Sequence, residues 1–352
     1  MSDLTTASGT IAITETDEFS DIPAASKLAP PRPDGSRPHL LYGCMGLGGA
    51  WSDPEYTTED IDVTWEALHA AASIGITELD LADIYSCGKS ERIVGEVLSR
   101  DAELRKHFSI QTKCGILLPL EGAVTRYDLS RDYISAALDA SLARLGVDRI
   151  DTLLLHRPDP LMNPESALDA IDEALAEGKI RSWGVSNMGP RLMELLVGAA
   201  TPLTINQLEL SLQARGFVES AMNVPSTSRA GSAYPVGTVE YCVTRGIDVQ
   251  AWSPLAHGRF TAPASSAIGK NRNPDEAATA RYIRDLAAIH MVTPETIALW
   301  WLTAHPAQIR PVIGTTNPDR ILACGDANQL ESKLTRDEWY TLLTLARGAN
   351  CP

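Results

Sequence analysis

The chain has 352 residues, of which 44% are hydrophobic and 21% charged, and its formal net charge is −15. This composition excludes an intrinsically disordered chain and is typical of a globular protein with a large core. The acidic balance, without any run of Lys or Arg, argues against a nucleic-acid-binding protein. No apolar run approaches the roughly 18 residues of a membrane span, so we expect neither nucleic acid nor membrane as a partner.

The N-terminal segment, residues 1–37, is rich in Ser, Thr, Pro and acidic residues. It lacks the basic and apolar regions of a secretory signal, so it predicts a poorly ordered tail. We expect one folded domain from Pro38 to residue 352. The six cysteines include no C-x-x-C pair, which favours reduced thiols in a cytoplasmic protein over a disulfide framework.

After Pro38, short apolar runs of strand type alternate with amphipathic helical patterns. The predicted strands are Leu40–Met45, Thr77–Asp80, Phe108–Lys113, Thr152–His156, Ser182–Ser186, Thr204–Gln207, Asp248–Trp252 and Pro311–Gly314. The predicted helices are Glu59–Ser73, Glu91–Ser99, Asp132–Leu145, Glu165–Glu177, Arg191–Val197, Val239–Arg245, Pro294–Ala304 and Pro318–Ala327. This alternation predicts the α/β class and a (β/α)8 TIM barrel, whose active site lies at the C-terminal ends of the strands.

Two long segments interrupt the alternation. Ser211–Gly237 follows the sixth predicted strand, and Thr261–Glu276 follows the seventh. Loops of this length in a compact domain are usually functional, so we expect both to lie over the C-terminal mouth of the barrel. Arg281–His290 predicts an added helix, and Thr335–Arg347 predicts a C-terminal helix that closes one side.

Polar side chains follow several of the predicted strands. Asp80 ends the second strand and Tyr85 lies in the loop after it, while Lys113 ends the third strand and His156 the fourth. Each residue alone has an ordinary structural explanation, because a strand-end Asp often caps a loop and a lone His is usually a hydrogen-bonded core residue. Together at one mouth of a barrel they predict a catalytic site. We expect Asp83, in the same loop, to have a structural role, and the helix that follows this loop to begin with Ser90 as its N-cap.

The motifs around these residues resemble a known family. LDLADIY, TKCG, LLLHRPDP, GVSN, NQLELS and AWSPLAHGR occur in this order between Leu40 and Gln329. They are similar to the motifs of the aldo-keto reductase superfamily, and the strings KCGI and HRPDPLM are most similar to its bacterial YdhF-like oxidoreductases. The resemblance implies that the catalytic tetrad is Asp80, Tyr85, Lys113 and His156.

This resemblance implies hydride transfer between NADPH and a small carbonyl or alcohol substrate, with Tyr85 as the general acid or base. A free Tyr has a pKa of about 10, and the Lys113 ammonium is expected to lower it by favouring the phenolate. Asp80 is expected to hold Lys113 through a buried ion pair. His156 is expected to orient the carbonyl and assist proton delivery.

The resemblance also implies an NADPH site, with NADH as the weaker cofactor and no metal. The expected cofactor-binding residues are Gly43, Cys44, Met45, Ser186, Asn187, Gln207, Trp252, Ser253, Leu255, Gly258, Arg259, Gly314, Thr315, Thr316, Asn317 and Arg320. Trp252 stands where the family usually has a stacking Tyr, and a Trp can stack as well. Arg320 matches the arginine near the 2′-phosphate, where a planar guanidinium suits the anion. Ala323 and Cys324 replace polar residues that often contact the adenine, so fewer contacts are expected there.

The expected substrate-pocket residues, from the loops after the first and third strands, are Trp51, Cys114, Ile116 and Tyr127. The loops choose the substrate in such a fold, so its identity does not follow from these motifs, and no pattern predicts the oligomeric state. One alternative is a non-catalytic NADPH-sensing regulatory barrel, which can keep the same tetrad. Another is a metal-dependent barrel hydrolase, although the chain lacks a His-x-His pair after the first strand, and such sites need three or more converging ligands.

Overall fold

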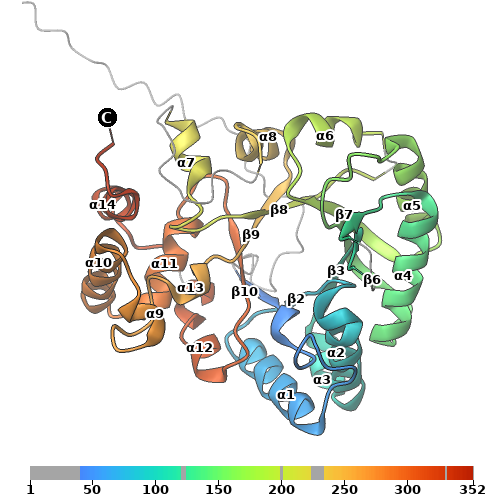
Figure 1. Cartoon of the computed structure of the whole chain (residues 1–352), viewed down its shortest axis with the longest axis horizontal. Coiled ribbons are helices and arrows are strands. Elements are labelled where there is room, and N and C mark those ends of the chain that lie inside the picture. The colour runs from blue at the N-terminus through green and yellow to red at the C-terminus, as the bar shows by residue number, and fades with distance from the viewer. Residues whose placement is uncertain (1–39, 120–123, 199–200, 223–233, 330, 352) are drawn as a thin grey trace, which may run out of the picture.

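The computed structural model describes residues 40–119, 124–198, 201–222, 234–329 and 331–351, so the predicted tail, residues 1–37, lies outside the described residues. Parallel strands close into a barrel in the order β1-β10-β9-β8-β7-β6-β3-β2, with helices packed around it (Figure 1). These strands are β1 (Leu41–Gly43), β2 (Glu78–Asp80), β3 (Ser109–Cys114), β6 (Ile150–Leu155), β7 (Ile180–Ser186), β8 (Ile205–Glu209), β9 (Asp248–Trp252) and β10 (Arg310–Ile313). The predicted (β/α)8 barrel is therefore confirmed, and each predicted strand forms.

The helices that alternate with these strands lie close to their predicted positions. They are α1 (Thr58–Ser73), α2 (Lys89–Arg100), α4 (Arg131–Leu145), α5 (Pro164–Ala176), α6 (Pro190–Leu195), α8 (Thr238–Arg245), α11 (Pro294–Thr303) and α12 (Pro318–Leu322). Side-chain caps fix several starts: Thr57 forms a capping box with Asp60 at α1, and Asn317 caps α12. None of the described helices combines the length and the apolar character needed to cross a membrane.

Further elements decorate the barrel. They are the hairpin β4 (Ile116–Leu117) and β5 (Arg126–Tyr127), the short helices η1 (Cys44–Gly46), η2 (Tyr85–Gly88), α3 (Ala102–His107), α7 (Gly216–Ala221), η3 (Ala256–Gly258), α9 (Ala267–Lys270) and α13 (Gly325–Gln329), and the longer helices α10 (Pro274–His290) and α14 (Arg336–Arg347). Helix α10 begins seven residues before the predicted Arg281, because Asn273 and Glu276 form a capping box at its start. The C-terminal helix forms as predicted.

Two local predictions were wrong. The predicted helix Pro318–Ala327 is divided into α12 and α13, and the hydroxyl of Thr293 donates to the carbonyl of Ala323 at the break. Gly88, with φ of 85°, is the N-cap of α2 in place of Ser90. The Ser90 hydroxyl instead donates to the carbonyl of Cys44 over 2.8 Å, which ties α2 to the turn after β1.

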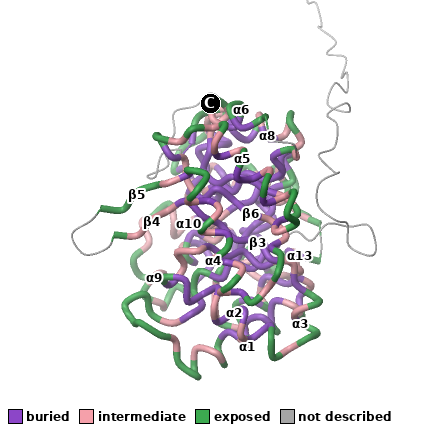
Figure 2. The backbone as a smooth tube through the Cα atoms, turned by 90° about the vertical axis from the view of Figure 1, so that its right-hand side faces the viewer, coloured by how far each residue is buried: buried purple, intermediate pink, exposed green. Residues whose placement is uncertain are grey.

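The core has an inner part within the barrel and an outer part between strands and helices, and Figure 2 shows the buried chain running through the middle of the molecule. Trp183, Trp300 and Trp301 are fully buried in the outer part. Gly184 on β7 lies so close to its neighbours that an added Cβ would stand 2.6 Å from Leu154 Cδ2 and 2.8 Å from the backbone oxygen of Ile205. Packing of β7 against β6 and β8 therefore requires a residue without a side chain.

Both long segments form helices in their described parts, and only Thr261–Glu276 contributes a residue, Thr261, to the lining of the pocket at the mouth. In the described part of Ser211–Gly237, α7 carries Glu219, whose Oε1 accepts hydrogen bonds from Arg215 Nε and Arg347 Nε, each over 3.1 Å. All three side chains are buried, so this ionic cluster attaches α7 to α14. The other loop, Thr261–Glu276, contains α9 and the start of α10.

Candidate active site

Asp80, Tyr85 and Lys113 meet at the C-terminal end of β2 and β3. Lys113 Nζ donates to Asp80 Oδ2 over 2.7 Å, to the carbonyl of Leu81 over 2.8 Å and to Tyr85 Oη over 3.0 Å. These three bonds use all three N–H groups of the ammonium. Lys113 and Asp80 are buried, so the ammonium has a fixed position directly beside the phenol oxygen.

The charges of this group act on Tyr85 in opposite directions. Burial raises the pKa of Tyr85 above its usual value and the charge of Asp80 adds to this increase, while Lys113 lowers it. The pKa of Tyr85 is raised overall. Lys113 therefore lowers this pKa as expected, but its effect is smaller than the combined effects that raise it. Burial alone would lower the pKa of Lys113, yet the charges of Asp80 and Tyr85 raise it above its usual value. Tyr85 therefore starts as a protonated phenol beside a charged ammonium.

His156 completes the group from the end of β6. Its ring lies edge-on to the ring of Tyr85, with the centroids 6.0 Å apart. Burial, together with Lys113 and Arg157, holds the pKa of His156 well below its usual value, so the imidazole is neutral at neutral pH. Its Nδ1 atom is buried and has no hydrogen-bond partner among the described residues.

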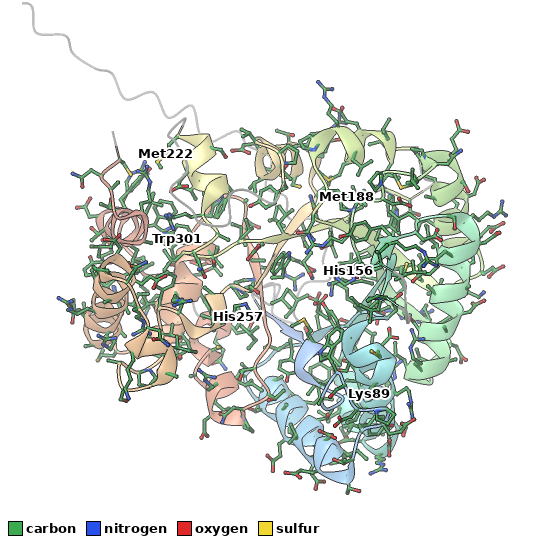
Figure 3. The ribbon with its side chains drawn as sticks, viewed as in Figure 1. Lys89, His156, Met188, Met222, His257 and Trp301 are labelled. Carbon is green, nitrogen blue, oxygen red and sulfur yellow. The ribbon has the colours of Figure 1, made fainter. Side chains whose placement is uncertain are left out.

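A pocket of about 560 Å³ opens above these residues at the C-terminal mouth of the barrel. Figure 3 shows two of its lining residues, His156 and His257, near the middle of the ring of strands. The predicted site residues that line it are Gly43, Met45, Trp51, Asp80, Tyr85, Ile116, His156, Ser186, Asn187, Gln207, Trp252, Ser253, Leu255, Gly258, Gly314, Thr315 and Arg320. The structure therefore places most of the predicted site in one cavity.

One wall of the pocket is a hydrogen-bonded group of polar side chains. Asn187 Nδ2 donates to Ser186 Oγ over 2.7 Å, and Asn187 Oδ1 accepts from Trp252 Nε1 over 3.1 Å. Ser186 Oγ in turn donates to the carbonyl of Gln207 over 2.9 Å. Asn187 and Ser253 have φ of 58° and 52°, and such unfavourable backbone conformations concentrate at functional sites. These bonds hold the indole of Trp252 at a fixed angle at the pocket wall.

Comparison with known proteins agrees with this geometry. A sequence model of the Aldo/keto reductase family matches residues 39–345. The chain belongs to the aldo/keto reductase family. It is 34% identical to the 6-dehydroglucose reductase of Agrobacterium fabrum, over 88% of this chain and 94% of that protein. It is also 30% identical to the oxidoreductase YdhF of Escherichia coli, over 79% of this chain and 86% of that protein, which confirms the predicted YdhF-like bacterial relative.

Solved structures show the same fold. The glycerol dehydrogenase of Gluconobacter oxydans superposes with a TM-score of 0.73 at 22% identity, covering 92% of this chain and 95% of that chain. An aldo/keto reductase of Klebsiella pneumoniae, solved in complex with NADP and acetate, superposes with a TM-score of 0.67 at 21% identity, covering 89% of this chain and 93% of that chain. These likenesses agree with the barrel described above.

Some predicted cofactor residues of this aldo/keto reductase do not line the pocket. Cys44 is buried, and its thiol donates to the carbonyl of Tyr42. Arg259 Nη1 lies 3.6 Å from Glu276 Oε2. Asn317 uses its side chain to cap α12 by accepting from Arg320 N over 3.1 Å, and Thr316 likewise lies outside the lining. Because α12 has only five residues, this end of the site is a short capped turn.

Two predicted substrate residues also lie away from the lining. Side chains alternate between the two faces of a strand, so Cys114 points away from the barrel interior, into which Lys113 points. Burial raises the pKa of the Cys114 thiol well above its usual value. Tyr127 lies on β5 opposite Ile116 and is 42% exposed. Trp51 and Ile116 do line the pocket.

The sequence motifs did not identify several residues that line the pocket. These are Ile84, Arg157, Pro254, His257, Thr261, Glu295, Val312 and Ile313. Arg157 follows His156 directly, and its guanidinium carbon lies 5.8 Å from the ring centroid of Trp252. It makes no hydrogen bond or ion pair with the described residues. Its position directly after a strand-end residue that is predicted to be catalytic was the one signal that could have indicated it.

Asp83 belongs to the loop that carries Tyr85 in this aldo/keto reductase. Its Oδ2 accepts from the hydroxyl of Tyr133 over 3.3 Å, and its Oδ1 is buried without a partner among the described residues. Burial raises the pKa of Asp83 from its usual 3.8 to about 7, and the charge of Glu91 adds to the rise while Arg144 opposes it. A loop carboxyl in these surroundings is largely protonated below neutral pH.

Proposed function

We propose that this aldo/keto reductase is an NADPH-dependent oxidoreductase that interconverts an aldehyde or ketone and the corresponding alcohol. The observation that carries the proposal is the hydroxyl of Tyr85, which lies 3.0 Å from Lys113 Nζ and lines the pocket together with His156. A phenol beside a fixed ammonium is a suitable proton donor to a developing alkoxide.

The residues of the pocket fit a nicotinamide nucleotide. Gln207 donates both N–H groups of its amide to neighbouring side chains, which leaves its Oε1 free to accept a bond from a carboxamide NH2 group. The indole of Trp252 is a flat surface for an aromatic ring. Arg320 is exposed at the rim, where its guanidinium can bind a phosphate. The Klebsiella pneumoniae relatives solved with NADP and NADPH support the same cofactor.

The chain's own residues account for the proton transfer. The bound cofactor supplies a hydride to the carbonyl carbon. Tyr85 and the neutral His156 hold the carbonyl oxygen, and Tyr85 then transfers its phenolic proton to that oxygen. Lys113 stabilises the phenolate that remains, and Asp80 keeps Lys113 in place until solvent returns a proton to Tyr85. In the oxidative direction the phenolate of Tyr85 takes the proton of the alcohol.

We further propose that the substrate is a polar, hydroxylated aldehyde. Arg157 and His257 line the pocket, and the Arg157 guanidinium lies against the ring of Trp252 without a hydrogen bond to the described residues. Glu209 lies close enough for its carboxylate to interact with the charges of Arg157 and His257. Such a mixture of donors and acceptors suits hydroxyl groups, and two relatives are named 6-dehydroglucose reductases. Arg157→Met should raise KM for 6-dehydroglucose at least tenfold and leave KM for an aromatic aldehyde unchanged, and equal effects on both would contradict this assignment.

The proposed function is tested by the absorbance of the reduced nicotinamide and by nucleotide titration. The wild-type protein should oxidise NADPH in the presence of a carbonyl substrate. Tyr85→Phe should lose this turnover by a factor of about 10² or more while its Kd for NADPH stays the same. Failure of the wild-type protein to bind NADPH would refute the proposal.

A second candidate is an NADPH-binding regulatory barrel. A putative voltage-gated potassium channel β subunit of Schizosaccharomyces pombe is 26% identical to this chain, over 85% of it and 88% of that protein. Tight NADPH binding without oxidation by a broad carbonyl panel would favour this candidate. Turnover that depends on Tyr85 would exclude it.

A further inference from the structure

Three glutamine side chains and Asp80 form a polar layer across the inside of the barrel. Gln111 lies on β3, Gln207 on β8 and Gln250 on β9, and all four side chains are buried. Asp80 pairs in register with Gln111, and Gln207 pairs with Gln250. The pair β2 and β3 lies across the barrel from the pair β8 and β9, with other strands between the two pairs in both directions around the barrel. TIM-barrel interiors are usually filled by branched apolar residues, so this layer departs from ordinary packing.

The hydrogen bonds of the layer determine how each amide is oriented. Asp80 Oδ1 accepts from Gln111 Nε2 over 2.6 Å and from Gln207 Nε2 over 2.9 Å. Gln250 Oε1 accepts from the same two nitrogens, each over 2.9 Å, and Gln250 Nε2 donates to Gln111 Oε1 over 3.1 Å. An ionised carboxylate only accepts hydrogen bonds. Each nitrogen near Asp80 must therefore be a donor, and no amide of the layer can flip without losing a bond.

The two oxygens of the Asp80 carboxylate bind different partners. Oδ2 binds Lys113, whose ammonium contacts the hydroxyl of Tyr85, while Oδ1 binds the two glutamine amides. Hydrogen bonds to a carboxylate stabilise its charge and weaken its effect on neighbouring groups. The negative charge of Asp80 raises the pKa of Tyr85 and Lys113 lowers it. By binding Oδ1, the two glutamine amides therefore reduce the rise in the pKa of Tyr85 that the charge of Asp80 causes.

We infer that Gln111 and Gln250 are positioning residues for proton transfer: they hold Asp80 and Gln207 in the orientation that keeps Lys113 beside the hydroxyl of Tyr85 and leaves the Gln207 carbonyl free to accept a bond from the carboxamide of the cofactor. Gln111 acts directly on Asp80, and Gln250 acts by orienting both Gln111 and Gln207. The inference rests on the proposed function in that a nicotinamide occupies the pocket. It also links the cofactor site to the proton donor, because Gln207 lines the pocket and donates a hydrogen bond to Asp80.

The test measures Kd of NADP⁺ by tryptophan fluorescence from about pH 7 to about pH 11, a range that includes the usual pKa of a Tyr and values about one unit above it, and it does not depend on turnover. The positive nicotinamide ring favours the phenolate, so NADP⁺ binding to the wild-type protein should tighten above a threshold pH. Tyr85→Phe should show no such threshold. Gln111→Met, which keeps the length of the side chain and removes its donors, should move the threshold up by about one pH unit. Gln250→Met should move it in the same direction by less.

The matched control is Asn206→Leu, which removes another buried amide from β8. Asn206 Nδ2 donates to the carbonyl of Met188 over 2.8 Å, and the hydrogen bonds of its side chain do not include Asp80. This variant should lose stability, measured by urea unfolding, while its threshold pH stays at the wild-type value. An unchanged threshold in folded Gln111→Met and Gln250→Met, or an equal displacement in Asn206→Leu, would overturn the inference.

The two proposals fail in distinguishable ways. A displaced threshold without turnover of any carbonyl would support the role of the glutamines and refute the reductase function. Turnover of a carbonyl together with an unchanged threshold pH in the variants would support the reductase function and refute the role of the glutamines. Absence of NADP⁺ binding by the wild-type protein would overturn both.

Discussion

The buried carboxyl of Asp83 predicts an unusual pH dependence of stability. Its pKa is raised from 3.8 to about 7 in the folded protein. A group with a raised folded-state pKa contributes stability that is complete below its unfolded value and is lost as the pH rises through its folded value. The contribution of Asp83 to the free energy of unfolding should therefore fall from about pH 4 to about pH 7, and this contribution should be absent in Asp83→Asn.

The size of this effect follows from the pKa difference. One pKa unit corresponds to about 1.4 kcal/mol, and about two units lie between pH 5 and the folded pKa of about 7. The stability of Asp83→Asn relative to wild type should therefore increase by up to about 3 kcal/mol between about pH 5 and pH 9. Asn is nearly isosteric with the protonated acid, so the two proteins should be closest in stability at the acidic end.

Urea unfolding at about pH 5 and about pH 9 measures this difference, and each unfolding free energy is compared with that of the wild-type protein at the same pH. The matched control is Asp62→Asn, because Asp62 is exposed on α1, and its difference from wild type should be the same at both pH values. An equal difference at both pH values for Asp83→Asn would show that Asp83 is ionised throughout and would refute the reasoning.

Three further substitutions test separate parts of the structure. Lys113→Met should lower kcat by about 10²–10⁴-fold, as measured by steady-state kinetics. It should also destabilise the fold by about 3–5 kcal/mol, as measured by urea unfolding, because the buried charge of Asp80 loses its ion-pair partner. A variant as stable as the wild-type protein would contradict this prediction. Gly184→Ala should cost about 1–3 kcal/mol of unfolding free energy, since its Cβ would stand 2.8 Å from the backbone oxygen of Ile205. An unchanged Cm would count against this close approach. Arg320→Ala should raise KM for NADPH about 10–100-fold by removing a charge-assisted hydrogen bond, whereas equal effects on NADPH and NADH would remove Arg320 from the phosphate site.

The proposed catalytic tetrad illustrates how far local sequence information reaches. Alternating apolar runs predicted each strand of the barrel, and a strand that ends in Asp80, Lys113 or His156 must present that residue at the C-terminal mouth. In a (β/α)8 barrel the C-terminal ends of all the strands lie at the same mouth. Residues that are far apart in the sequence could therefore be assigned to one cavity. Capping motifs such as Asn273 with Glu276 were also present in the sequence but were not used, and α10 was therefore predicted too short.

Only the tertiary structure decided how these side chains affect one another. The net rise in the pKa of Tyr85 depends on burial and on the competing charges of Asp80 and Lys113, and a sequence pattern does not state how deeply a group is buried. The contacts among Gln111, Gln207 and Gln250 cross the barrel interior between residues up to 139 positions apart. Local periodicity specifies which face of a strand a side chain occupies, but distances across a closed barrel depend on strand order and register.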